Sequence, residues 1–390
     1  MRIFICADIH FPRGDAGANR IQYVAKAIMA AGQDVVIISC GRKDGELNKD
    51  GFFYYDGIKY KNITVGNNKI LKILNKKIFS GKSVLNILKQ FNPSEKDIIY
   101  IYGSNSLFVY PIMKYAERKN ICSYIEVVEW HQPYQYKYGS VNPGYISSNK
   151  TFESLAPRIG NVLAISEKIA DYYKEKKCNV DVFPVFIDTD SQFINSDFLD
   201  EKYVHLVYPG KPQTKDNIAT MIKAMLLLPR EELDRCVFHI TGTTESAICE
   251  ALGNERDLLD ALGEHIIFHG WMEYDELVDL YQKMDFLYMC RFNNEVSQAN
   301  FPSKLPELMA WGIAPICNKV GDYYRYLEDG KNAFIFDNDS VDDCVSALKR
   351  ALKLSEEEKM IMKRNARQCA IDHFDYRSWQ KKLTDFLRLS

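Results

Sequence analysis

The sequence alternates short apolar runs with longer amphipathic stretches along nearly all of its 390 residues, and this alternation constrains the fold more than any other feature. Near the start, an apolar run at 2–7 precedes an amphipathic stretch at 18–32, and a second apolar run follows at 33–40. Short apolar runs predict buried strands, and amphipathic stretches of this length predict the helices that connect parallel strands. We therefore expect an α/β fold that is built on parallel sheets.

The alternation occurs in two halves, which predicts two domains. The polar stretch 188–203 separates the halves and is the expected linker. We expect an N-terminal domain at 1–190, a C-terminal domain at 191–371 and a terminal amphipathic helix at 372–390. Further strands are expected at 97–103, 122–130, 161–166, 180–186, 205–210, 236–242, 266–270, 285–290 and 313–317.

Composition and cysteine spacing exclude several classes of protein. The net charge of −2 at pH 7 argues against a general nucleic-acid-binding protein. The ten cysteines are scattered and include no C-x-x-C pair, so neither a zinc site nor a disulfide framework is expected. No apolar run is long enough to span a membrane, and the N-terminus predicts a strand rather than a signal peptide. We expect a cytoplasmic protein that is soluble or peripheral to the inner face of the plasma membrane.

One segment departs from the mixed charge of the rest. Eight lysines and no acidic residue lie between Asp56 and Glu95, and the stretch 69–79 has apolar residues at helical spacing between its lysines. Two interpretations remain: a solvated helix face that covers the first domain, or a surface in 59–89 for anionic lipid or an anionic acceptor.

Two loops that follow expected strands are candidates for anion binding. The first, 12–22, is rich in small residues where the backbone meets a helix start, which favours an anion but also fits a tight turn. It is not a G-x-G-x-x-G sequence, so a standard dinucleotide fold is disfavoured. In the second loop, Gly210 ends a strand, and Lys211 and Lys215 precede the next helix. Two cations on one loop suit a diphosphate, although two surface lysines are also common.

Two further stretches carry polar residues near strand ends. Ser303 is expected to cap a short helix, and Glu307 follows one turn later, where a carboxylate can accept two sugar hydroxyls. Glu307 also fits an ordinary first-turn glutamate that complements the helix dipole. His131 lies just past the expected strand 122–130, where ligands of open α/β sheets bind, although a lone histidine is often structural.

Taken together and in this order, the four stretches resemble the retaining glycosyltransferases of family 4, which have the GT-B fold. The most specific part is 266–336, with its F-P-S-K-x-x-E motif at 301–307, and it is similar to the subgroup that builds bacterial surface polysaccharides. The resemblance implies two Rossmann-like domains with parallel sheets that face each other across a cleft. It also implies that the second domain holds most of the nucleotide-sugar and that the last helix, 372–390, packs back on the first domain.

The resemblance implies a role for each matched residue. Glu307 would bind the ribose hydroxyls, Lys215 a phosphate, and His131 would lie near the transferred sugar; these three are the expected catalytic residues. The other expected donor-binding residues are Gly17 and Ala18 in the first loop and Gly210 and Lys211 in the second. Gly270, Trp271 and Met272 would contact the nucleotide base, and Arg291 the sugar or a phosphate. Ser303, Lys304 and Leu305 would form the helix start whose backbone faces the diphosphate.

One position departs from the family pattern. Many members carry a second glutamate eight positions before Glu307, in contact with the donor sugar, and this chain has Ala299 there. Glu295 or Asn300 is the expected substitute. The donor sugar is therefore not predicted.

The expected function is retaining transfer of a sugar from a UDP- or GDP-sugar to a saccharide or lipid-linked acceptor in polysaccharide biosynthesis. We expect no metal or other cofactor, so that lysines, backbone amides and a helix end meet the charge of the departing diphosphate. Two alternatives remain: a nucleotide-sugar 2-epimerase, which needs acidic residues in the cleft, and a catalytically silent GT-B subunit that binds a partner enzyme.

Overall fold

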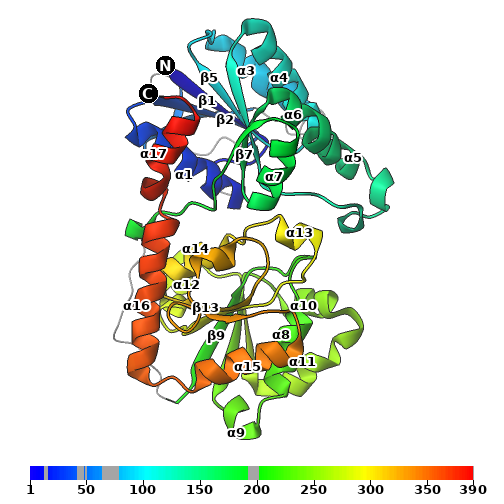
Figure 1. Cartoon of the computed structure of the whole chain (residues 1–390), viewed down its shortest axis with the longest axis vertical. Coiled ribbons are helices and arrows are strands. Elements are labelled where there is room, and N and C mark those ends of the chain that lie inside the picture. Colours follow the sequence, from blue (N-terminus) through cyan, green and yellow to red (C-terminus); the bar gives the residue numbers. More distant parts are fainter. Residues whose placement is uncertain (13–15, 42–47, 49–50, 64–78, 192–201, 390) are drawn as a thin grey trace. The chain divides into compact units, whose positions relative to one another are not determined.

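The computed structural model describes residues 1–12, 16–41, 48, 51–63, 79–191 and 202–389 (Figure 1). The chain divides into two compact units, Met1–Ile187 with Tyr376–Ser390, and Asp188–Asp375. The boundaries predicted from the sequence were residues 190 and 371. Each unit has its own sheet of mainly or wholly parallel strands between helices (Figure 1). The prediction of an α/β fold with two parallel sheets is confirmed.

The sheet of the first unit has the strand order β3-β4-β2-β1-β5-β6-β7-β8. Its central strands are buried on both faces, as expected for strands covered by helices on either side. The order reverses between β1 and β5, so the loops that follow these two strands diverge. The strands are β1 (Arg2–Ala7), β2 (Asp34–Ser39), β3 (Phe53–Tyr55), β4 (Ile58–Asn62), β5 (Ile98–Tyr102), β6 (Cys122–Val127), β7 (Asn161–Ala164) and β8 (Asn179–Val182).

The antiparallel pair β3–β4 was not predicted from the sequence. Asp56 and Gly57, which join these strands, both have positive φ, at 48° and 77°. This is the turn conformation that an Asp-Gly pair favours in a two-residue hairpin, so the signal was present in the sequence.

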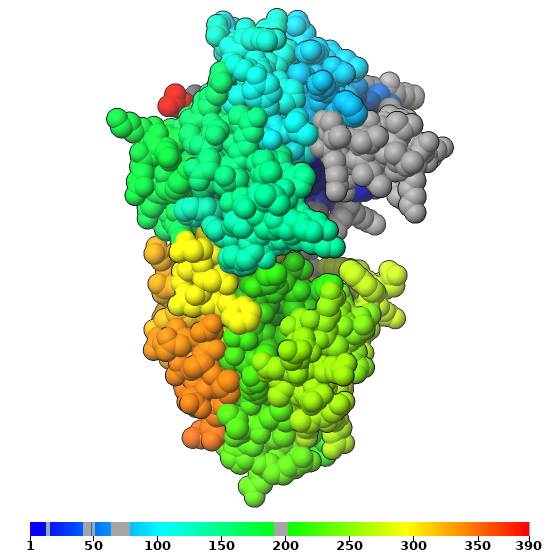
Figure 2. All heavy atoms as spheres, turned by 90° about the vertical axis from the view of Figure 1, so that its right-hand side faces the viewer, coloured from blue at the N-terminus to red at the C-terminus, as the bar shows by residue number. Residues whose placement is uncertain are grey.

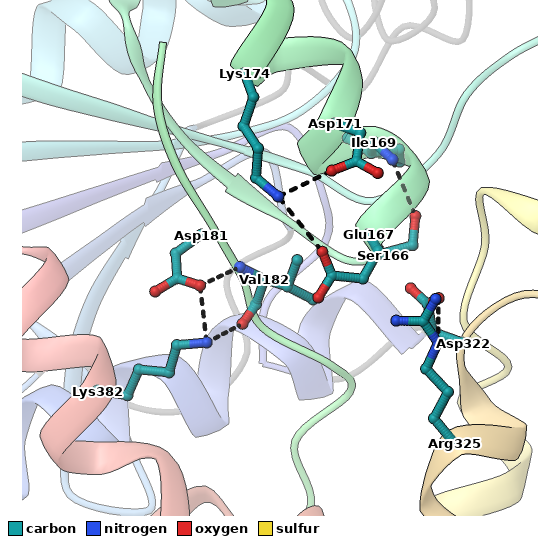
Figure 3. Close-up of polar contacts among 10 residues, drawn as sticks. All are labelled: Ser166, Glu167, Ile169, Asp171, Lys174, Asp181, Val182, Asp322, Arg325 and Lys382. Carbon is teal, nitrogen blue, oxygen red and sulfur yellow. Dashed lines mark hydrogen bonds and ion pairs between the residues drawn. The ribbon is translucent and has the colours of Figure 1, made fainter.

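The helices of the first unit include the C-terminal segment of the chain. Tyr376 stacks on Tyr23 at 6.1 Å between ring centroids, which packs α17 on α1. Lys382 of α17 donates to the Val182 carbonyl at 3.0 Å and pairs with Asp181 at 2.8 Å, at the edge strand β8 (Figure 3). The helices are α1 (Ala16–Ala30), α3 (Ser80–Gln90), α4 (Ser106–Lys119), α5 (Pro143–Lys150), α6 (Ala156–Ile159), α7 (Glu167–Glu175) and α17 (Tyr376–Phe386), with a π-helical turn at Thr151–Leu155.

The second unit has a sheet with the order β11-β10-β9-β12-β13-β14, in which every pairing is parallel. The order reverses between β9 and β12, which makes the carboxyl ends of these strands a switch point where ligands of such sheets bind. The strands are β9 (Val204–Pro209), β10 (Cys236–Thr241), β11 (Ile266–Gly270), β12 (Phe286–Met289), β13 (Ala314–Asn318) and β14 (Phe334–Phe336).

Helices surround this second sheet (Figure 1). Several begin at a side-chain cap, such as Asn217 before α8, whose Oδ1 accepts from the Thr220 amide at 3.2 Å. The helices are α8 (Ile218–Leu226), α9 (Arg230–Leu233), α10 (Glu245–Leu252), α11 (Asp257–Leu262), α12 (Tyr274–Tyr281), α13 (Glu295–Gln298), α14 (Lys304–Ala310), α15 (Val341–Leu352) and α16 (Glu356–His373).

The expected helix at 372–390 is present as α17, but it is shorter than predicted, at Tyr376–Phe386. The helix α16 ends at His373, and α17 begins at Tyr376. Between them, the Asp375 carboxylate accepts hydrogen bonds from the Thr189 amide at 3.1 Å and from its hydroxyl at 2.6 Å.

Some predictions fall partly outside the described residues. The expected amphipathic helix at 69–79 lies outside them except for its last residue, as does most of the expected linker 188–203. Among the helices that the structure describes, none has both the length and the apolar character needed to cross a membrane.

Candidate functional site

The switch point of the second unit is built around glycines at the strand ends. Gly210 follows β9 with φ of +81°, and Gly242 follows β10 with φ of +65°. A β-carbon on Gly242 would lie 3.3 Å from the Gly210 Cα, and one on Gly210 would lie 3.6 Å from the Cε of Lys304. Both positions therefore need glycine for backbone conformation, and Gly242 also for the close approach of the two loops.

Lys304, the first residue of α14, places its ammonium group inside this cluster. Its Nζ lies 4.0 Å from the centroid of the Tyr208 ring. The Nζ atom is buried and has no hydrogen-bond partner among the described residues. Burial lowers the pKa of Lys304 to about 8, although the Asp216 carboxylate opposes this shift. A buried ammonium without an acceptor is destabilising, and an anion beside it would supply the missing acceptor.

Asp216 and Arg291 form a buried ion pair at the site. They bridge the loop after β9 to the segment after β12, with Arg291 Nε 3.6 Å from Asp216 Oδ1. Burial raises the pKa of Asp216, but the charges of Arg291 and Lys304 outweigh it and leave the pKa below its usual value. Arg291 Nη1 also donates to Asn300 Oδ1 at 3.1 Å. Arg291, an expected ligand of the sugar or phosphate, is thus already held by protein groups.

The other expected cations lie on the loop after β9. The Lys215 carbonyl accepts from the Phe292 amide at 3.0 Å, and the Lys215 charge contributes to the lowered pKa of Lys304. The exposed Lys211 is 3.3 Å from Glu250 on α10. The half-buried Glu307 acts on the same ammonium with the opposite sign. The structure therefore brings Lys215, Lys304 and Glu307 into one electrostatic cluster.

The expected helix cap at Ser303 is wrong. Ser303 precedes α14 but has helical backbone angles, and its side chain makes no capping hydrogen bond. Pro302 and Pro306 on either side hold this turn together without a hydroxyl cap. Gly17 and Ala18, expected where the first loop meets the helix start, lie in the first turn of α1, which begins two residues earlier than predicted, and the preceding residues 13–15 lie outside the described part.

The remaining predicted residues differ in exposure. Leu305 is fully buried, whereas Trp271, just after β11, is 86% exposed beside Gly270 and Met272. Ala299 is fully buried after α13. Of its two expected substitutes, Glu295 is exposed, and the buried Asn300 is bound to Arg291.

The first unit has a pocket of about 160 Å³ where β1, β5 and β6 end. Among the described residues, three carboxylates line it, from Asp8, Glu126 and Glu129, and no lysine or arginine does. His131 also lines it, with Nδ1 2.9 Å from the Tyr136 hydroxyl and Nε2 3.7 Å from the Glu129 carboxylate. The tyrosine and the glutamate together fix the orientation of the imidazole ring.

One of these carboxylates, Glu126, is held in a buried ion pair. Arg20 Nε is 2.5 Å from Glu126 Oε1, and the Tyr100 hydroxyl donates to Glu126 Oε2. Arg20 also donates to the carbonyls of Phe183, at 3.0 Å, and Pro184. Arg20 and Tyr100 were not predicted from the sequence, because nothing in a single sequence pairs an arginine on a helix with a glutamate on a distant strand.

Two Asp-x-Asp sequences, at 188–190 and 337–339, are not among the candidate residues predicted from the sequence. Asp188 accepts from the Asp190 amide at 3.3 Å, and Asp337 pairs with Lys319. Among the described residues, no group of three or more His, Cys, Asp or Glu side chains is arranged to hold a metal ion.

Comparison with known proteins identifies the second unit. Residues 190–369 match the family model of glycosyl transferases group 1. This match covers nearly all of the second unit, Asp188–Asp375. The chain is therefore a glycosyltransferase, and the predicted resemblance to this class of enzyme is confirmed. A search of curated proteins found no match to it.

Solved structures of glycosyltransferases share the fold over the whole chain. A glycosyltransferase from Rickettsia africae has a TM-score of 0.69 and 15% identity, covering 100% of this chain and 99% of that one. Sucrose-phosphate synthase from Thermosynechococcus elongatus has a TM-score of 0.71 and 15% identity, covering 100% and 98%. HepE from Anabaena, in complex with UDP and glucose, has a TM-score of 0.68 and 12% identity, covering 100% of both chains. The glycosyltransferase thus has the GT-B fold that was predicted.

Proposed function

We propose that this glycosyltransferase uses a UDP- or GDP-sugar as donor and binds the diphosphate at the switch point of the second unit. The observation that carries the proposal is the buried Lys304 Nζ, which has no hydrogen-bond partner among the described residues. Lys215 adds a second positive charge, and Asp216 with Arg291 holds the surrounding loops. HepE, which shares the fold, was crystallised with UDP and with UDP-glucose, and this supports a nucleotide-sugar donor.

The other predicted residues have proposed roles around this diphosphate. Glu307 accepts the two ribose hydroxyls, and the segment Gly270–Met272 contacts the base. The amide of Gly210 and the side chain of Lys211 lie on the phosphate side. No cofactor is required in this proposal, because Lys215 and Lys304 meet the charge that develops on the departing diphosphate.

Transfer is proposed to retain the anomeric configuration through a front-face route. The bond between the sugar C1 and the phosphate oxygen breaks, and a bond from the acceptor oxygen to C1 forms on the same face. The acceptor's proton passes to the departing phosphate oxygen. His131 positions the sugar, with its ring held by Tyr136 and Glu129.

The acceptor is proposed to be a saccharide or a lipid-linked saccharide of polysaccharide biosynthesis at the cytoplasmic membrane surface. A basic groove between α3 and α4 supports contact with anionic lipid. It is lined by Lys82, Lys89, Lys114, Arg118 and Lys150, of which Lys114 pairs with Glu117. Phe79, Leu107 and Tyr110 line it with exposed fractions of 43%, 51% and 47%. Of the predicted lysine-rich surface 59–89, two lysines lie in this groove.

The binding test uses Lys304→Met, which keeps the length of the side chain and removes its charge. We expect the variant to bind UDP more weakly by about 1–3 kcal/mol, the usual effect of losing a charged hydrogen bond. Its affinity for uridine, which has no phosphate, should not change. Calorimetry on both ligands measures this, with Lys353→Met at an exposed position as control. Equal affinity of wild type and Lys304→Met for UDP would refute the proposed diphosphate site.

Product analysis separates the remaining alternatives. Incubation with UDP- and GDP-sugars should release the nucleoside diphosphate and yield a glycosylated acceptor whose anomeric configuration, read by NMR, matches that of the donor. Activity should persist in EDTA. A donor epimerised at C2 would instead indicate the epimerase, and no reaction with any donor would indicate a silent subunit.

A further inference from the structure

The first unit carries a long tyrosine-rich connection between β6 and the π-helical turn at Thr151–Leu155. We call residues 131–150 the tyrosine loop; it contains 3₁₀ turns at Pro133–Gln135 and Gly139–Val141 and the helix α5. It leads from the end of the sheet out to α5 and back (Figure 1), and its atoms face the viewer in Figure 2. Connections of this length within a compact unit are uncommon and are usually functional.

The tyrosine loop is held by hydrogen bonds within itself. Asn142 accepts from the Gly144 amide at 2.8 Å and donates to the Lys137 carbonyl at 2.7 Å. Gln135 accepts from the Gln132 amide at 2.7 Å. The ring of Tyr136 packs against Gly144, where a β-carbon would come within 3.3 Å of it. These contacts give the tyrosine loop a defined conformation.

Its apolar side chains are nevertheless exposed. Tyr134 and Tyr138 have exposed fractions of 58% and 72%, and Val141 and Ile146 have 71% and 53%. Tyr138 has φ of +73°, a conformation that is unfavourable for a bulky residue. A group of exposed apolar side chains on an ordered loop is typical of a surface that binds a ligand or a partner.

Both ends of the tyrosine loop reach the acidic pocket of the first unit. His131 at one end and Ser148 near the other line the pocket, and Thr151 follows directly. The Thr151 hydroxyl is buried and has no hydrogen-bond partner among the described residues. An elongated ligand with one end in the pocket could therefore also contact the tyrosine loop, since both lie on the surface of this unit.

The pocket and the loop together match the chemistry of a glycan. Carboxylates such as Asp8 and Glu129 accept hydrogen bonds from sugar hydroxyls. Because the described residues that line the pocket include no lysine or arginine, a phosphate is disfavoured there. Sugar rings present faces of C–H bonds, which pack on the flat faces of tyrosine rings. The loop has only two cations, Lys137 and Lys150, unlike the basic groove at α3 and α4, so a lipid surface suits that groove better.

We infer that the acceptor is an oligosaccharide, which places its terminal sugar in the acidic pocket and its preceding rings on Tyr134 and Tyr138 of the tyrosine loop. This inference rests on the proposed function, because it names the class of acceptor. It assigns the loop to the recognition of chain length rather than to the reaction itself.

The test compares wild type with the double variant Tyr134→Ser, Tyr138→Asn, using the full chain. Asparagine tolerates the positive φ at position 138, so the loop should keep its shape. Tyr54→Ser, at a partly exposed tyrosine on β3, is the control. The probe is an array of neutral mono- to hexasaccharides, and the glycans retained are then titrated by calorimetry. Anionic vesicles serve as a second probe.

We expect wild type and Tyr54→Ser to bind trisaccharides and longer glycans more tightly than monosaccharides. The double variant should bind the longer glycans about tenfold more weakly, since two aromatic contacts are lost, with unchanged affinity for monosaccharides. The inference is overturned if wild type retains no glycan, if affinity does not depend on length, or if the double variant loses vesicle binding instead. UDP binding is measured on the same samples; its absence would count against the proposed donor site while leaving the glycan result readable.

Discussion

At the scale of single residues, the buried ammonium group of Lys304 destabilises the free protein, but it lies where it can bind the diphosphate of the proposed donor. Its pKa is about 8 in the folded chain, against an ordinary value of 10.5. Between these two pH values Lys304 binds more protons in the unfolded chain than in the folded chain. The contribution of Lys304 to the free energy of unfolding therefore rises with pH from about 8 to 10.5. The charged and titratable groups that face it are Tyr208, Lys215, Asp216, Arg291 and Glu307.

A bound diphosphate favours the charged lysine, so UDP affinity should depend on pH. We expect the affinity to fall as the pH rises through about 8, where the free enzyme loses the proton of Lys304. Lys304→Met should remove this dependence and raise the melting temperature of the free protein at pH 7, because the buried charge is gone. Calorimetry from pH 7 to 9.5 and thermal melts measure both effects. A lower melting temperature for the variant would show that Lys304 is mainly a stabilising partner of Asp216.

Tyr136 is a positioning residue for His131. Replacing it with phenylalanine keeps the ring and removes the hydroxyl that lies 2.9 Å from the imidazole Nδ1. We expect Tyr136→Phe to lower kcat by roughly tenfold, while KM for the donor stays constant, because a looser His131 affects the reacting geometry. Steady-state kinetics test this, with Tyr145→Phe as the control, since Tyr145 contacts only the ring of Tyr136 in this cluster. A purely structural role for Tyr136 would lower the melting temperature and leave kcat unchanged.

The buried pair of Arg20 and Glu126 should dominate the electrostatic stability of the first unit. Arg20→Leu leaves the Glu126 carboxylate buried without its cation, which costs about 3–5 kcal/mol in the free energy of unfolding. Urea unfolding measures the change. Arg158→Leu breaks the exposed pair with Glu117 and is the matched control, in which we expect a far smaller effect. Similar losses in both variants would mean that burial does not set the strength of the first pair.

At the scale of secondary-structure elements, the strands were predictable where a short apolar run is ended by a polar residue or glycine. β1 at Arg2–Ala7, which is buried over most of its length, and β11 at Ile266–Gly270, which is only partly buried, both have the predicted bounds. The strands expected to reach 130 and 186 stop at Val127 and Val182, since apolar residues beyond a strand can still be buried by packing alone.

The candidate site was predictable only as far as it follows strand ends. Lys215, Glu307 and His131 could be placed because they follow expected strands or begin an expected helix. The buried ammonium of Lys304, its contact with Tyr208 and the pair of Asp216 with Arg291 depend on which strands lie side by side. That order comes from the packing of the sheet and is not encoded in any local pattern.

The last helix provides the test at this scale. Leu383 and Leu387 of the 376–390 segment belong to the same hydrophobic core as β1 and α1. Deleting 376–390 should expose that core and unfold the first unit, while the second unit keeps its fold and its affinity for UDP. Calorimetric melting should then show one cooperative transition in place of two, and UDP should stabilise the one that remains. If the first unit of the truncated chain still melted cooperatively, the segment 376–390 would not be needed for the core of that unit to fold.

At the scale of the whole molecule, the chain enters the second unit once and leaves it once. The first unit is made of Met1–Ile187 and Tyr376–Ser390, and the second is the continuous segment between them. This arrangement has a consequence for synthesis on the ribosome. The second unit can fold while the chain is still growing, but the first must wait, with part of its core uncovered, until the final residues emerge. A nascent chain of this enzyme should therefore need chaperones for its N-terminal half rather than for its C-terminal half. In a prematurely terminated chain, the incomplete first unit should expose apolar residues of its core and so make the chain a target for degradation.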